Sequence, residues 1–185
     1  MKIKSVAIST ILALGLVSAA NAEDAQIIPD HGHGKVTFKG AIIDAPCSIS
    51  PDSIDQTVEL GQISNMALVG GGKSTPRPFD INLENCNVEK LDKKGVKLTF
   101  TGAAASFDDQ NTTLGIVGTG SGAGVQITDG SGEVIKLGTA TPLQGIQNGY
   151  NTLRFSAYLK GNGGDIDTIT AGEFSSVADF TLSYE

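Results

Sequence analysis

Short stretches in which apolar residues occupy every second position recur along most of the chain. In an extended strand such residues point to one face of a sheet. Segments rich in Gly, Pro, Asp and Asn separate the stretches, and the sequence contains 24 glycines. Because no window beyond the first 22 residues has the period of an amphipathic helix, this pattern predicts an all-β fold, a β-sandwich. The predicted strands are Thr57 to Ile63, Phe79 to Leu83, Val96 to Phe100, Val125 to Ile127, Leu153 to Leu159 and Phe174 to Tyr184.

The first 22 residues are typical of an export signal. Lys2 and Lys4 precede a mostly apolar run over residues 6–17, and Ala20-Asn21-Ala22 matches a small-x-small cleavage site. We therefore expect residues 1–22 to be a signal peptide that is cut between Ala22 and Glu23. The run is shorter than the roughly 20 residues of a membrane-spanning helix, and no later stretch is apolar enough for one. The mature chain of 185 − 22 = 163 residues is expected to be an exported protein without a membrane span, with one folded domain.

The mature chain is acidic. The sequence has 13 Lys and Arg and 20 Asp and Glu, and the signal holds two of the lysines, which leaves 11 − 20 = −9. A net negative chain without a basic cluster repels phosphate backbones, and the sequence has no Trp for stacking on bases. We therefore exclude nucleic acid as a partner.

Cys47 and Cys86 are the two cysteines, and both lie in the exported part. An even number of cysteines in an oxidising compartment predicts a disulfide. The loop of about 40 residues would restrict the unfolded chain by about 4 kcal/mol on the chain-entropy estimate. A metal or redox site would need CxxC spacing or nearby histidines, and neither cysteine has them.

The sequence offers no set of residues for catalysis. His31 and His33, its two histidines, lie in a polar tail, so a Ser/His or Cys/His triad lacks a base and a metal lacks a third ligand. Residues 72–74 resemble the end of a phosphate loop, but Pro76 prevents the helix that must follow. Residues 118–124 are glycine-rich without a βαβ setting, and we expect a flexible loop. We predict no active site, cofactor or metal.

Two segments near the ends of the mature chain each present one apolar face. Residues 34–42 alternate so that Val36, Phe38 and Ile42 share one face while Lys35, Thr37 and Lys39 share the other. This segment fits either an ordinary first strand or a tethered strand that completes the sheet of another molecule. The last predicted strand ends one residue before the chain does, so its sheet edge is either paired internally or open. The residues on its apolar face are Phe174, Ser176, Ala178, Phe180, Leu182 and Tyr184.

Several motifs occur together, in one order, over essentially the whole mature chain. Gly172 is the fourteenth residue counted back from the C-terminal residue, and Tyr184 is penultimate. In this order the chain resembles the pilin subunits of chaperone-usher fimbriae, and closely resembles the major rod pilins of P-type and related pili. The other matching residues are Gly34 to Gly40, Asp44 to Ser50, Leu60 to Ile63, Leu83 to Cys86 and Phe180 to Glu185.

The resemblance implies an incomplete immunoglobulin-like β-sandwich that lacks its last strand, over residues 43–185, preceded by an N-terminal donor-strand extension over residues 23–42. Another chain would fill the resulting groove by strand addition. The donor residues would be Gly34, Val36, Phe38, Gly40 and Ile42, with Gly40 where the groove is too shallow for a side chain. The acceptor groove and chaperone contact would include Gly172, Phe174, Ala178, Phe180, Leu182 and Tyr184.

The function that this resemblance implies is structural. The chain would be a major rod pilin that polymerises by donor-strand exchange into an extracellular fimbrium and supports cell adhesion. Its partners would be a periplasmic chaperone, an outer-membrane usher and further copies of itself. A minor adaptor or terminator pilin carries the same motifs and remains an alternative. A tip adhesin that binds a host glycan would usually need a lectin domain before the donor segment. An enzyme is disfavoured because the sequence has neither a catalytic triad nor a set of metal ligands.

Overall fold

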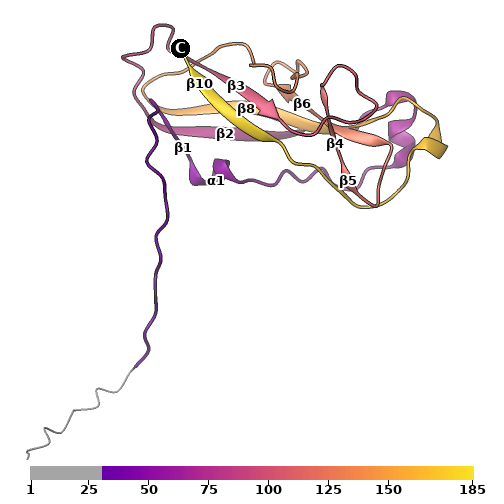
Figure 1. Ribbon diagram of the computed structural model, residues 1–185, viewed down its shortest axis with the longest axis horizontal. Coiled ribbons are helices and arrows are strands. Elements are labelled where there is room, and N and C mark those ends of the chain that lie inside the picture. Colours follow the sequence, from indigo (N-terminus) through magenta and orange to yellow (C-terminus); the bar gives the residue numbers. More distant parts are fainter. Residues whose placement is uncertain (1–30) are drawn as a thin grey trace, which may run out of the picture. The chain divides into compact units, whose positions relative to one another are not determined.

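The computed structural model describes residues 31–185, so the predicted signal peptide and its cleavage site at Ala22 and Glu23 lie outside the described residues. The chain divides into two units, one of which ends at Ala41 while the other spans Ile42–Glu185. Residues 31–41 form no helix or strand. All the helices and strands of the described residues lie in the second unit (Figure 1).

The larger sheet has five antiparallel strands in the order β1-β2-β8-β6-β4. Its centre is β8, which places Phe155 opposite Phe79 and Leu153 opposite Ile81 of β2. Successive side chains of these strands alternate between the core and the outer face, as the sequence predicts. The five strands are β1 (Ser48–Ile49), β2 (Arg77–Cys86), β4 (Thr113–Gly115), β6 (Ala123–Asp129) and β8 (Gly149–Gly161).

A second sheet has the order β10-β3-β7, and two short strands, β5 and β9, pair separately. The bounds are β3 (Gly95–Thr101), β7 (Gln144–Gly145) and β10 (Asp179–Tyr184), with β5 (Val117–Gly118) and β9 (Phe174–Ser175). The helices are short: α1 (Pro51–Ile54), and the 3-10 helices η1 (Asn65–Gly71) and η2 (Ile166–Thr168). Among residues 31–185, no helix has the length and apolar character needed to cross a bilayer.

The two larger sheets pack face to face through aromatic side chains. The ring of Phe100 in β3 meets that of Phe155 in β8 edge-on, at a centroid distance of 5.1 Å. Phe100 also lies 6.3 Å from the ring of Phe180 in β10. Ile81 of β2 and Leu98 of β3 are fully buried in the same core. The all-β sandwich predicted from the sequence is confirmed.

Four predicted strands are confirmed, because β2, β3, β6 and β8 contain them. The strand predicted over residues 57–63 is wrong, since these residues form no ladder with a neighbouring strand and Gly61 has a φ of 79°. The strand predicted over residues 174–184 is interrupted. Its first part, β9, pairs with β5, whereas β10 pairs with β3, so the chain changes partner across residues 176–178.

Candidate strand-acceptor groove

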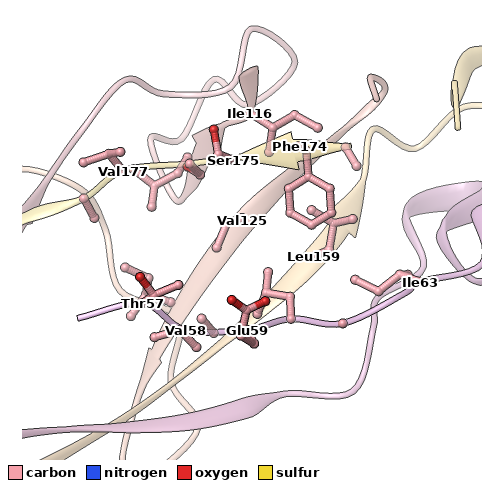
Figure 2. A pocket seen from close by; sticks show the side chains of 18 of the residues that line it. Thr57, Val58, Glu59, Ile63, Ile116, Val125, Leu159, Phe174, Ser175 and Val177 are labelled. Carbon is pink, nitrogen blue, oxygen red and sulfur yellow. The ribbon is translucent and has the colours of Figure 1, made fainter. Parts of the chain in front are cut away.

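A groove of about 1340 Å³ runs along the sandwich between two irregular segments. One wall consists of residues 54–65, from the last residue of α1 to the first of η1, and the other consists of residues 169–180, which carry β9 and the start of β10. Figure 2 shows Thr57, Val58 and Glu59 on the first wall and Phe174, Ser175 and Val177 on the second. Val125 and Leu159 lie between them, on the floor.

The floor of the groove is the apolar inner face of the larger sheet. It includes Ile81 from β2, Leu159 from β8, and Val125 and Ile127 from β6, all of them core residues. Phe100 of β3 also lines the groove. The groove therefore reaches the hydrophobic core itself, which is unusual in a domain that folds around a closed interior.

The C-terminal wall belongs to a strand with an open edge. β10 stands at the end of its sheet and has β3 as its one strand neighbour among the described residues, with Phe180 opposite Phe100 and Tyr184 opposite Val96. The other edge of an end strand presents unpaired backbone N–H and C=O groups, which can accept an additional strand. An extended peptide in the groove would find backbone partners there as well as apolar floor.

The structure places four of the six predicted acceptor residues at the groove: Gly172, Phe174, Ala178 and Phe180. Leu182 and Tyr184 do not line it. They lie further along β10, where they pack against the core opposite Leu98 and Val96.

The sequence reasoning missed the opposite wall and the floor. The wall at residues 54–65 contains the alternating stretch for which the sequence predicts a strand, and period two alone does not show whether a segment has a strand neighbour. Its start is held to β2, because Ser53 Oγ accepts a hydrogen bond from the Asn82 backbone N–H at 3.0 Å and Gln56 Nε2 donates to the Asp80 carbonyl at 3.2 Å.

Glycines bring the C-terminal wall close to the glycine-rich segment 118–124. A Cβ atom on Gly172 would lie 2.4 Å from the backbone nitrogen of Gly120. The N–H groups of Thr119 and Gly120 both donate to the Glu173 carbonyl, at 3.0 and 2.9 Å. The segment predicted to be a flexible loop is therefore anchored to the wall by backbone hydrogen bonds, and its residues Gly120 and Ser121 line the groove as well.

The predicted donor residues are exposed. The exposed fractions of the residues Val36, Phe38 and Ile42, relative to a fully exposed reference, are 75%, 90% and 105%. A Cβ atom added to Gly34 or Gly40 would meet no atom within 4 Å, so nothing in the described structure requires glycine at either position. Large apolar side chains that are this exposed, close together in sequence, are typical of a surface that binds a partner.

The end of β10 is fastened by the last residue. The backbone groups of Glu185 and Gly95 exchange hydrogen bonds of 2.9 and 3.0 Å. The Glu185 carboxylate accepts hydrogen bonds from Lys93 Nζ, at 2.7 Å, and from Lys97 Nζ. The hydrogen bond from Lys93, followed by that from Lys97, lowers the pKa of Glu185 from 4.5 to about 2.

The predicted disulfide is confirmed. It joins Cys47, just before β1, to Cys86, the last residue of β2. His31 and His33 lie in the exposed segment before the sandwich. No group of three or more His, Cys, Asp or Glu side chains that could hold a metal ion occurs in the part of the chain that the structure describes.

An open end strand, a groove that reaches the core and an exposed alternating segment define an immunoglobulin-like β-sandwich that lacks its last strand. The family model described as "Fimbrial protein" matches residues 36–185. The chain therefore belongs to the fimbrial protein family, the pilins of chaperone-usher fimbriae, as the sequence motifs indicate.

Relatives match over the whole length. The chain is 54% identical to the Fimbria A protein of Serratia marcescens and 45% identical to the Major MR/P fimbria protein of Proteus mirabilis, in both cases over 100% of each chain. A solved structure of a chaperone-usher pilus, determined to explain rod uncoiling, matches with a TM-score of 0.73 and 34% identity over 84% of this chain and 97% of that chain.

Proposed function

We propose that this pilin polymerises by donor-strand exchange, in which residues 34–42 of one copy fill the groove of the next. The observation that carries the proposal is that one chain contains both an open groove and an exposed segment of matching pattern. Gly34, Val36, Phe38, Gly40 and Ile42 would point to the floor, because side chains at every second position share a face. The backbone of the segment would pair with β10 and extend its sheet.

The donor is long enough to run along most of the groove wall. Gly34 to Ile42 is eight residue steps, about 26 Å when extended, and the wall at residues 169–180 is eleven steps of partly irregular chain. Burial of Val36, Phe38 and Ile42 would contribute about 1.5–3 kcal/mol each. Each ladder hydrogen bond would add about 0.5–1.5 kcal/mol. Since an ordinary domain is stable by about 5–15 kcal/mol, the donor supplies a large share of the stability of the filled subunit.

An empty groove exposes core and strand edge, and such a subunit aggregates readily. A dedicated periplasmic chaperone therefore occupies the groove until an outer-membrane usher brings the next subunit, and the product is an extracellular fimbrium that supports adhesion. The full-length similarity to a major fimbria protein favours the role of main rod subunit over adaptor, terminator or tip adhesin. The same similarity to structural pilins favours a protein without enzymatic activity.

The test of strand exchange uses two neighbouring positions of the donor. Gly40→Leu places a leucine side chain on the face that meets the floor, whereas Ala41→Leu places the same side chain on the opposite face and serves as the control. We expect Gly40→Leu to slow polymerisation severely while the chaperone-bound monomer still accumulates, and Ala41→Leu to polymerise normally. The effect is measured by the yield of fibres in electron microscopy and by the ladder of undissociated polymers in gel electrophoresis. Normal fibres from Gly40→Leu would refute the proposal.

A further inference from the structure

The charged residues that line the groove all have the same sign. Four carboxylates occur among its lining residues, and no Lys, Arg or His does. Asp55 and Glu59 belong to the first wall, and Glu173 and Asp179 to the second. All four are exposed, so they stand at the mouth of the groove, above the apolar floor. None of them forms an ion pair with another residue in 31–185.

The donor segment has the opposite charge. Residues 31–42 contain Lys35 and Lys39 and no Asp or Glu, although the mature chain as a whole is strongly acidic. Both lysines occupy odd positions, the face opposite Val36 and Phe38. When the apolar face meets the floor, both ammonium groups therefore point outward, to the level of the rim.

The spacing of the charges also agrees. Lys35 and Lys39 are four residues apart, about 13 Å in an extended strand. Asp55 and Glu59 are likewise four residues apart, on a wall that follows the groove. Neighbouring strands lie only about 4.8 Å apart, so a flexible lysine side chain above the groove reaches carboxylates on either wall.

We infer that the rim carboxylates Asp55, Glu59, Glu173 and Asp179 guide the lysine-bearing N-terminal segment of a second copy into the groove. This inference rests on the proposed strand exchange and adds a selection step to it. The field at the mouth attracts and orients the segment before the slower apolar contacts form, which raises the rate of entry. Segments of other subunits that lack the two lysines would enter more slowly, so the charges favour self-assembly.

The test follows the entry of labelled peptides of residues 31–43 into the full mature chain held by its periplasmic chaperone. We expect a Lys35→Gln/Lys39→Gln peptide to enter about tenfold more slowly than the natural peptide at low salt. The difference should shrink towards none at about 1 M salt, where charges are screened within about 3 Å. A Lys35→Arg/Lys39→Arg peptide, which keeps both charges, should enter at the natural rate.

The acceptor is varied in the same way. The acceptor variant neutralises all four rim carboxylates, with Asp55→Asn/Glu59→Gln/Glu173→Gln/Asp179→Asn. The natural peptide should enter this variant about tenfold more slowly than it enters the natural acceptor. The Lys35→Gln/Lys39→Gln peptide should enter the variant at the same rate as the natural peptide, because the effects of interacting charges are not additive. The matched control neutralises four exposed carboxylates that do not line the groove, with Asp92→Asn/Asp109→Asn/Glu133→Gln/Asp167→Asn, and should leave the rate unchanged.

The outcomes separate the two proposals. If the natural peptide never displaces the chaperone, strand exchange itself is refuted. If it enters but its rate is insensitive to salt, to the lysines and to the rim, strand exchange remains and the guiding role is overturned. An equal loss of rate in the control acceptor would also overturn it, since net charge rather than the rim would then be responsible.

Discussion

Gly172 and Gly120 approach so closely that a single added carbon cannot fit, because a Cβ on Gly172 would lie 2.4 Å from the Gly120 nitrogen. The neighbouring Thr119 backbone would lie 2.5 Å away. These atoms are backbone and cannot rotate aside. The contact fixes the C-terminal wall of the groove against segment 118–124.

Gly172→Ala is therefore expected to destabilise the groove-filled subunit by about 1–3 kcal/mol, the usual range for overpacking. Gly145→Ala is the matched control, because a Cβ there would meet nothing within 4 Å. Thermal unfolding of the chain complemented with a peptide of residues 31–43 measures both. Equal stability of the two variants would contradict the steric role of Gly172.

The disulfide between Cys47 and Cys86 is expected to contribute about 4 kcal/mol by restricting the unfolded chain. Cys47→Ser and Cys86→Ser should each lower the free energy of unfolding by about this amount and reduce the periplasmic level of the subunit. Denaturant titration and immunoblotting check the two effects. The double variant should be no worse than either single one, and unchanged stability in the single variants would refute a stabilising disulfide.

The ion pairs of Glu185 predict a specific dependence on pH. Because the folded-state pKa of Glu185 is lowered from 4.5 to about 2, its contribution is fully present above pH 4.5 and is lost as the pH falls towards 2. Glu185→Gln should therefore be less stable than the natural chain at neutral pH and equal to it near pH 2. Urea unfolding at several pH values measures this.

Glu133→Gln removes an exposed carboxylate elsewhere and serves as the control for that titration, with no expected difference at neutral pH. The result that would contradict this prediction is a difference in the free energy of unfolding between the natural chain and Glu185→Gln that stays constant from neutral pH to pH 2. It would show that the lysine contacts do not stabilise β10 through charge.

A buried polar network on the larger sheet offers a fourth test. Tyr158 donates a hydrogen bond of 2.8 Å to Gln126 Oε1, and both side chains are buried. Tyr158→Phe would leave that oxygen without its donor, at a cost of about 1–3 kcal/mol. Tyr150→Phe, at a position with 74% of its surface exposed, is the control and should be neutral. Chemical denaturation of the peptide-filled subunit compares the two variants. If Tyr158→Phe is as stable as Tyr150→Phe, the hydrogen bond to Gln126 does not contribute to stability.

The alternating pattern predicted the inner strands because they have neighbours inside the chain. Phe79 and Phe155 are paired across β2 and β8, and β8 has a second neighbour in β6. Thr57 to Ile63 shows the same alternation without forming a ladder, because alternation records which face is apolar and not whether an edge is paired.

The candidate site was predicted in part for a related reason. Phe174 and Phe180 carry the apolar face of the last stretch, and the family motif marks Gly172, so one wall was visible in the sequence. The opposite wall has no motif of its own, and the break at Ser176, whose hydroxyl donates to the Gly115 carbonyl at 2.8 Å, depends on a contact between distant segments. Such contacts leave no local signal.

The position of the disulfide has a mechanical consequence. A pull on residues 31–42 reaches the sandwich through Cys47, one residue before β1, whose two residues pair with β2. The few backbone hydrogen bonds between β1 and β2 would break one after another under tension. The covalent link to Cys86 would instead pass the load to the end of β2, where the long β2–β8 ladder shares it, so in the proposed strand-exchanged fibre the load would fall on the central strands and not on the two-residue strand β1.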